Sequence, residues 1–138
     1  MPNSTNYEKK GKVAIITLKS PPVNALGFLL RQGILDGLKL AIEDNRIEAI
    51  VLIGDGRCFS GGADIREFGN PPTNPSLQDV IECLESIKKP VIAAIHETAI
   101  GGGLELVLGC HFRLGATTAK LGCPEIKLGL IPGGGATQ

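Results

Sequence analysis

The 138-residue sequence lacks several features on which large classes of proteins depend. It has no excess of charge, because 14 basic side chains balance 14 acidic ones, and this balance excludes the strongly basic surface of a nucleic-acid-binding protein. Its longest apolar stretches, such as 91–95 and the glycine-interrupted 99–108, fall far short of the roughly 20 residues that a membrane-spanning helix needs. We therefore expect a soluble protein that has neither nucleic acid nor a membrane span among its partners.

Metal-binding patterns are also missing. The four cysteines form no CxxC pair, and only two histidines, His96 and His111, accompany them, so we expect no zinc or other metal site. Three of the cysteines lie in apolar stretches, which favours buried free thiols in a reducing compartment. The four are Cys58, Cys83, Cys110 and Cys123.

Neither end of the chain carries a targeting pattern. Residues 1–11 are polar, carry both signs of charge and have no apolar run of the secretory type. The last four residues, Gly-Ala-Thr-Gln, do not form a C-terminal peroxisomal signal. We interpret 1–11 as an N-terminal polar segment and 12–138 as one domain, whose 43% of hydrophobic residues is enough for a core.

Strand and helix patterns alternate along this domain. The residues at 30, 34, 38 and 42 are apolar and predict one buried helix face, while the continuous apolar run 49–53 predicts a strand covered on both faces. Ser76 is a typical N-cap for the next helix. Such alternation indicates an α/β domain with a largely parallel sheet. The expected strands are 12–18, 49–53, 90–95 and 111–116, and the expected helices are 26–43, 76–87 and 102–108.

A glycine-rich loop follows the second of these strands. It begins like a dinucleotide-binding fingerprint, but Phe59 replaces the third glycine, and Gly62 and Ala63 replace the Lys and Ser/Thr of a P-loop. Nucleotide chemistry is therefore disfavoured. The small residues at 61–63 let backbone N–H groups approach a ligand closely, and Asp64 can cap a short helix at that point.

A second glycine-rich turn, at 101–103, opens the helix 102–108. Unpaired N–H groups and the positive end of the helix dipole favour an oxygen that becomes an anion, so Gly102 is a candidate oxyanion donor. Glu105 lies one turn along on the same face, where it can handle a proton or a water molecule. Read only as local structure, such a turn is a tight connection and such a glutamate is a solvated or capping carboxylate.

A second candidate carboxylate is Glu125. It follows Pro124, which restricts the local backbone, and its apolar neighbours Leu121, Ile126 and Leu128 favour the uncharged form. With Glu105 it can make a pair, one ionised and one protonated, of the kind that acid/base chemistry on a bound water uses. Composition and spacing alone thus indicate an α/β domain with one oxyanion site.

Taken together and in order, six segments resemble the crotonase (enoyl-CoA hydratase/isomerase) superfamily. The resemblance runs from about residue 12 to the last residue, and it implies an α/β fold made of a spiral of β-β-α units, of which this chain holds the N-terminal core only. The sequence 101–111 is most like the hydratase parts of bifunctional peroxisomal enzymes of fatty-acid β-oxidation. The segments are Pro22–Ala25, Phe59–Ile65, Lys89–Ile95, Gly101–Leu106, Gly122–Glu125 and Gly129–Gln138.

This resemblance implies roles for particular residues. Ala63 and Gly102 match the family's two backbone N–H donors, which hold the thioester carbonyl as it becomes an enolate, and Glu105 and Glu125 match the two glutamates of hydratases. The stretch Ala63, Asp64 and Ile65 resembles the segment along which CoA lies. The implied activity is that of an enoyl-CoA hydratase, which adds water to a 2-trans-enoyl-CoA. The implied cofactor is none, since CoA is part of the substrate, and NAD is not expected for this segment.

Two alternatives stay open at this stage. One is a 3-enoyl to 2-enoyl-CoA isomerase that uses a single glutamate as its base. The other is a non-catalytic truncated fragment, because the family's domain is longer than this chain and its further helices cover the acyl pocket. Whichever reading holds, we expect this chain to expose an apolar patch that favours aggregation, and we expect self-association through the missing C-terminal portion. The resemblance suggests a peroxisomal location, with mitochondrion or cytoplasm as the alternatives.

Overall fold

The computed structural model describes residues 4–138, in which a five-stranded sheet supports three helices. The strand order is β1-β2-β3-β4-β6, with β1 antiparallel to β2 and all other neighbours parallel. The prediction of an α/β domain with a largely parallel sheet is therefore confirmed. The strands are β1 (Thr5–Lys10), β2 (Val13–Leu18), β3 (Ala49–Gly54), β4 (Val91–Ile95) and β6 (Phe112–Gly115).

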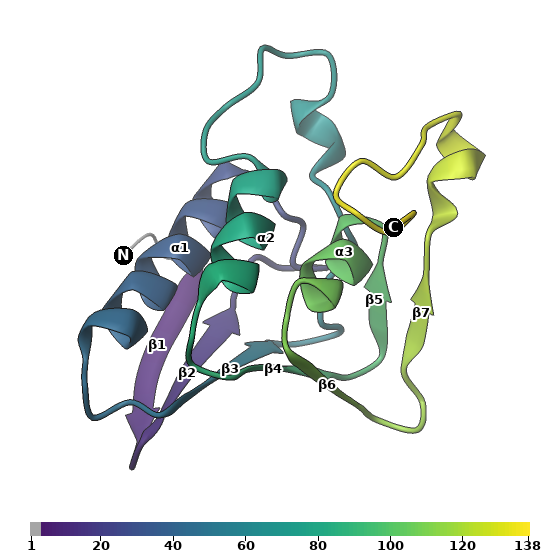
Figure 1. Cartoon of the computed structure of the whole chain (residues 1–138). Coiled ribbons are helices and arrows are strands. Elements are labelled where there is room, and N and C mark those ends of the chain that lie inside the picture. Colours follow the sequence, from purple (N-terminus) through teal and green to yellow (C-terminus); the bar gives the residue numbers. More distant parts are fainter. Residues whose placement is uncertain (1–3) are drawn as a thin grey trace.

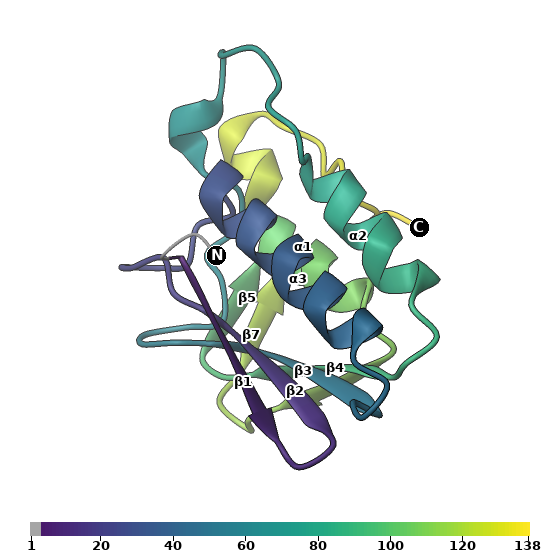
Figure 2. The same ribbon diagram turned by 90° about the vertical axis from the view of Figure 1, so that its left-hand side faces the viewer.

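All three helices lie on one face of this sheet (Figures 1 and 2). A short second sheet pairs β5 (Thr98–Ile100) with β7 (Lys120–Gly122), and it stands beside α3 in Figure 1. The helices are α1 (Phe28–Glu43), α2 (Leu77–Ser86) and α3 (Gly102–Leu108), and the described residues also form two 3-10 turns, η1 (Ile65–Glu67) before α2 and η2 (Pro124–Leu128) after β7. None of the helices in the described part of the chain is both long enough and apolar enough to span a bilayer.

The buried face of α1 follows the predicted pattern for three of its four positions. Leu30, Ile34 and Leu38 are fully buried against the sheet, but Ile42 is exposed and Ala41 is buried in its place. A spacing of four residues advances about 40° beyond a full turn at each step, so the fourth position has rotated away from the core. The expected N-cap of α2 is confirmed, because Ser76 Oγ accepts from the Asp79 N–H and Asp79 Oδ2 accepts from the Ser76 N–H.

The central strands are covered on one face rather than two. In β3, Ile50 and Leu52 are fully buried under the helices, whereas Val51 and Ile53 on the other face are half-buried. The prediction of a strand covered on both faces is therefore wrong for the described residues. Apolar side chains at consecutive positions show only that a strand tolerates burial, and the layer that covers each face comes from elsewhere in the chain.

The polar N-terminal segment forms a strand that was not expected. β1 pairs with β2 along its whole length, from Thr5 opposite Leu18 to Lys10 opposite Val13. It occupies the edge of the sheet, where most of its side chains face solvent and only Thr5 is buried. Backbone pairing with the strongly apolar β2, rather than its own side chains, makes this segment a strand, and residues 5–10 therefore join the sheet of the domain.

Candidate active site

The loop after β3 presents the Ala63 N–H to the surface of the domain. The Leu26 N–H donates to Gly62 O at 2.8 Å, and this carbonyl belongs to the same peptide unit as the Ala63 N–H. In a trans peptide the two groups point in opposite directions, so holding Gly62 O aims the Ala63 N–H away from Leu26. Within residues 4–138 this N–H donates to no protein acceptor. Gly62 has φ +101°, and an added Cβ would lie 2.9 Å from Ile100 O, so the turn requires glycine.

The second donor stands beside the first. Gly102 begins α3, and its N–H has no acceptor among the residues that the structure describes. Its peptide is held because Gly101 O accepts from the Glu105 N–H at 3.1 Å. A Cβ built on Gly102 would lie 3.3 Å from the Ala63 nitrogen. Two unpaired N–H groups this close can reach a single oxygen, which is the arrangement of an oxyanion hole.

Two buried polar side chains support this loop from below. Asn24 donates through Nδ2 to three carbonyls of the loop, those of Asp55, Cys58 and Phe59, at 2.9 to 3.2 Å. Ser60 Oγ donates to Asn24 O at 2.8 Å and accepts from the Gly62 N–H at 3.2 Å. Sequence reasoning assigned neither residue a role. The sequence signal that could have identified them is that each is a polar residue within an otherwise apolar motif, since a polar group that becomes buried needs hydrogen-bond partners.

Glu105 is a buried carboxylate held by a remote segment. Its Oε1 accepts from the Gly134 N–H at 2.6 Å and from the Ala136 N–H at 3.4 Å. Backbone N–H donors offset the cost of taking a charged oxygen out of water. The stretch 133–136 therefore holds the carboxylate of Glu105 in place. Figure 1 shows this last segment of the chain passing beside α3.

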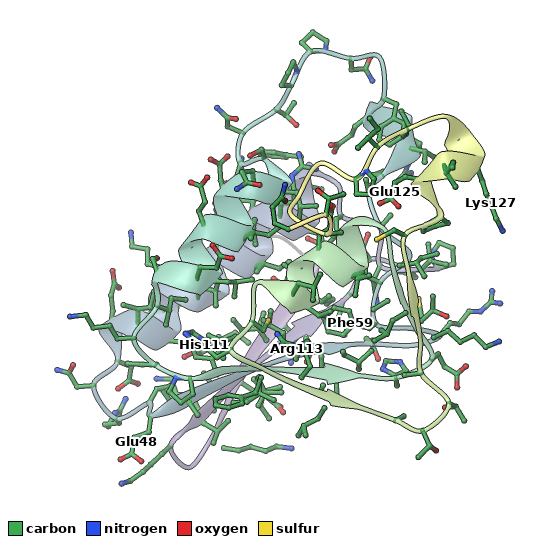
Figure 3. All side chains as sticks on the ribbon, turned by 45° about the vertical axis from the view of Figure 1, so that its right-hand side comes forward. Glu48, Phe59, His111, Arg113, Glu125 and Lys127 are labelled. Atoms are coloured by element: carbon green, nitrogen blue, oxygen red, sulfur yellow. The ribbon has the colours of Figure 1, made fainter. Side chains whose placement is uncertain are left out.

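Glu125 approaches the start of the same helix. It lies in η2, and a Cβ built on Gly101 would be 3.1 Å from Glu125 Oε1. Its Oε2 is buried without a hydrogen-bond partner among residues 4–138, so the fold leaves this oxygen unpaired. Figure 3 shows Glu125 on the side of η2 nearer to α3, whereas Lys127 projects outward from the same turn.

The apolar neighbours predicted for Glu125 do not enclose it in this structure. Leu121, Ile126 and Leu128 are each more than half exposed. The predicted apolar environment is therefore wrong for Leu121 and Ile126, whereas Leu128 lines a small hollow together with Glu125. A short strand and a 3-10 turn at the surface present such side chains outward, because nothing among residues 4–138 packs over them.

One cavity brings the predicted residues together. Its volume is about 280 Å³, and its wall includes the two N–H donors and the two carboxylates, those of Ala63, Gly102, Glu105 and Glu125. Its apolar wall is formed by Phe68, Leu77, Leu130 and Ile131. A smaller hollow of about 90 Å³ shares Ala63, Gly102 and Glu125 and extends toward Ile65. The cavity can therefore hold a carbonyl oxygen on the N–H pair with two carboxylates beside it.

Asp64 and Ile65 continue from this cavity along η1. Asp64 caps the turn as predicted, because its Oδ1 accepts from the Arg66 N–H at 3.0 Å, and its carboxylate also pairs with the Arg66 guanidinium at 2.7 Å. The hydrogen bonds from Arg66 hold the pKa of Asp64 below its usual value. Ile65 is exposed beside the smaller hollow. The carboxylate of Asp64 is thus engaged in structure, while Ile65 is free to contact a ligand.

The cysteines form no site of their own. Cys58 and Cys110 are buried, and burial raises the pKa of the Cys110 thiol to about 12, so it stays protonated. Cys83 is half-buried and Cys123 is exposed. Across residues 4–138 there is no group of three or more His, Cys, Asp or Glu side chains arranged to hold a metal ion.

Comparison with known sequences decides the family. The sequence profile described as enoyl-CoA hydratase/isomerase matches residues 8–138. The chain belongs to the enoyl-CoA hydratase/isomerase family. Among its relatives, a probable enoyl-CoA hydratase of Bacillus subtilis is 44% identical over 133 residues, which cover 91% of this chain and 52% of that protein. The peroxisomal bifunctional enzyme of Danio rerio is 46% identical over 129 residues, which cover 94% of this chain and 18% of that enzyme.

Solved structures of this family show the same fold. An enoyl-CoA hydratase subunit of Geobacillus kaustophilus superposes with a TM-score of 0.89 at 35% identity, over 98% of this chain and 55% of that one. The enoyl-CoA hydratase of Bacillus anthracis has a TM-score of 0.89 at 32% identity, over 99% of this chain and 56% of its own. The expected crotonase-like fold is confirmed. The chain spans about half the length of these hydratases and a fifth or less of the bifunctional enzyme.

Proposed function

We propose that this chain carries the catalytic core of an enoyl-CoA hydratase, which adds water across the double bond of a 2-trans-enoyl-CoA in fatty-acid β-oxidation. The observation that carries the proposal is the single cavity that is lined by both unpaired N–H donors and by both glutamates. The names of the relatives support the same substrate class. Isomerisation needs only one base, so two carboxylates in one cavity favour hydration.

The two N–H groups carry the first part of the proposed reaction. The thioester oxygen accepts hydrogen bonds from Ala63 and Gly102, and it takes up negative charge as water attacks C3. Each such donor is worth on the order of 3 kcal/mol of the barrier. Glu105 orients the water and accepts its proton, because its carboxylate lines the cavity and is held in place by the Gly134 N–H.

Glu125 carries the second part. It delivers a proton to C2 of the enolate, because it lines the same cavity and no group among residues 4–138 pairs with its Oε2. The oxygen and one hydrogen of water end in the hydroxyl group at C3, and the hydrogen added at C2 comes from Glu125. Before the next turnover Glu105 gives the proton it accepted to solvent and Glu125 takes one up, so the net reaction is the addition of one water molecule, and no electrons pass to or from the protein. The proposal therefore includes no metal and no redox cofactor, and NAD has no part in it.

Two further assignments belong to this proposal. The CoA portion lies along Ala63, Asp64 and Ile65, beside the smaller hollow. We assign the protein to the peroxisome because it is similar to peroxisomal enzymes of animals and plants. A bacterial protein is about equally similar, so the location needs a test of its own. Imaging the tagged full-length gene product against a peroxisomal marker tests it, and a mitochondrial or diffuse pattern would contradict it.

The catalytic proposal is tested at Glu125. Because several cavity-lining side chains are exposed here, the assay uses the 138 residues joined to the remaining part of the Bacillus subtilis relative. Glu125→Gln is expected to slow hydration by a factor of at least about 10³, the scale of general acid/base catalysis. Isomerisation of a 3-enoyl-CoA by the same variant should be affected less.

The matched control is Lys127→Gln, which alters a side chain that projects outward from the same turn. It should leave hydration unchanged. Hydration at the parental rate by Glu125→Gln would contradict the proposed function, and so would an equal loss in the control.

A further inference from the structure

We infer that Arg31 is a positioning residue that fixes the Gly62–Ala63 peptide, and with it the direction of the Ala63 N–H donor. The significance of that donor rests on the proposed function, but the contacts of Arg31 do not. The Arg31 side chain is only 8% exposed, although it carries a full positive charge, and it lines neither of the hollows described above.

The guanidinium of Arg31 uses all five of its N–H donors. Nε donates to Pro75 O at 2.6 Å, and Nη1 donates to Leu26 O at 2.6 Å and to Glu67 Oε2 at 2.7 Å. Nη2 donates to Thr73 through its Oγ1 at 3.0 Å and its carbonyl at 3.4 Å. One side chain of α1 thus joins three segments that are separate in sequence.

The first connection runs through Leu26. Its carbonyl accepts from Arg31, and its own N–H donates to Gly62 O at 2.8 Å. Since Gly62 O and the Ala63 N–H belong to one rigid peptide unit, the guanidinium holds the residue that sets the orientation of this donor.

The second connection reaches the other side of the same peptide. Glu67 lies in η1, which begins two residues after Ala63, and it accepts from Arg31 through Oε2 and from the Phe28 N–H through Oε1 at 2.6 Å. The segment that leaves Ala63 is therefore held against the start of α1, which is the element that carries Arg31. The Gly62–Ala63 peptide is anchored from both ends by contacts that meet at one guanidinium.

The third connection holds the segment 68–75, which leads from η1 to α2. Arg31 binds it at Thr73 and Pro75, immediately before the cap of α2 at Ser76. Phe68, at the other end of this segment, lines both hollows of the site. Arg31 therefore also sets where this apolar wall stands relative to the N–H donors.

The fork of an arginine is needed for these contacts. A lysine keeps the charge and the stem, but its three donors on one nitrogen cannot reach acceptors spread around a plane. Arg31→Lys is therefore the informative variant. A merely structural role would loosen the whole domain, whereas a positioning role loosens the contacts around Leu26 and Glu67 first.

The test is residue-resolved amide hydrogen exchange on the 138-residue chain. In Arg31→Lys, the amides of Leu26 and Phe28 should exchange at least about tenfold faster through local opening, while Ile50 in β3 keeps its parental rate. The matched control is Arg113→Lys, because Arg113 also donates to three carbonyls, but at the carboxyl end of α3. It should leave Leu26 unchanged. Uniform acceleration that includes Ile50, or no change at Leu26, would overturn the inference.

A second readout links the peptide to ligand. Butyryl-CoA labelled with ¹³C at the thioester carbonyl is added to the fused protein used to test the proposed function, and its carbonyl stretch is recorded by infrared spectroscopy. The parent should shift this band to lower frequency, and Arg31→Lys should return the band of the bound ligand toward that of free butyryl-CoA. A bound band that is identical in parent and variant would overturn the inference. Absence of any shift in the parent would contradict the proposed function instead, and the exchange result would still decide the role of Arg31.

Discussion

Glu105 Oε1 accepts a hydrogen bond from the backbone N–H of Gly134 at 2.6 Å, across 29 positions of the chain. The carboxylate belongs to the short helix α3, and the donor belongs to a segment without regular structure. An added Cβ at Gly134 would lie 2.7 Å from Glu105 Oε2, so the backbone itself lies against the carboxylate. The orientation of the proposed base is thus set by chain that lies well outside its helix.

This contact separates the structural from the chemical role of Glu105. Glu105→Gln keeps an oxygen acceptor for Gly134 but loses the base, so hydration by the fused protein should fall by about 10² to 10⁴ while its unfolding midpoint in urea hardly moves. Glu105→Leu leaves the Gly134 N–H without an acceptor and should also lower the free energy of unfolding by about 1 to 3 kcal/mol. Parental turnover in Glu105→Gln would show that this side chain is not the base.

The proposed oxyanion donor at Gly102 can be removed while its position in the fold is kept. Gly102→Pro deletes the N–H at the first position of α3, where proline is tolerated, and kcat should fall by about 10² to 10³. The comparison is Gly102→Ala, which keeps the N–H, although its Cβ would lie 3.0 Å from the flexible end of Leu77. We expect a smaller loss for alanine, and equal losses in the two variants would argue against hydrogen bonding as the cause.

The cap of α2 predicts a pH-dependent stability. Hydrogen bonds from the Ser76 hydroxyl, and then from its backbone N–H, hold the pKa of Asp79 below its usual value of 3.8. A folded-state pKa that is lowered contributes stability above the unfolded value, and this contribution is lost as the pH falls below about 4. Ser76→Ala should therefore be less stable than the parent at pH 7, with the gap narrowing on acidification. Urea unfolding between pH 7 and pH 3 measures this difference in unfolding free energy. A difference that widens in acid would contradict the lowered pKa of Asp79.

Exposed apolar side chains beside the cavity predict self-association of the 138-residue chain. Ile126 and Ile131 are 83% and 85% exposed, and Leu128 and Leu130 lie between them. Apolar surface of this kind favours association in water. Sedimentation velocity over a range of concentrations should show a rising average mass, which the double variant Ile126→Ser/Ile131→Ser reduces. A monodisperse monomer at every concentration would contradict the prediction.

The sequence by itself determined the elements whose signals are local. The start of α3 at Gly102, the cap at Ser76 and the strands β2, β3, β4 and β6 were predicted close to their observed bounds. Each depends on neighbouring residues only, through apolar spacing, a capping hydroxyl or a run of glycines. The family, and the four candidate site residues, also followed from motifs that are continuous in sequence.

Only the tertiary structure determined which distant segments of the chain contact one another. The polar segment of β1 became a strand through pairing with β2, and Arg31, on a helix face, joined Leu26 to Glu67. Lys89 donates to the carbonyls of Ala41 and Asp44, at the carboxyl end of α1. Hydrogen bonds between segments 40 residues apart have no local signature, because any polar side chain can make them and only the packed chain brings the acceptor within 3 Å.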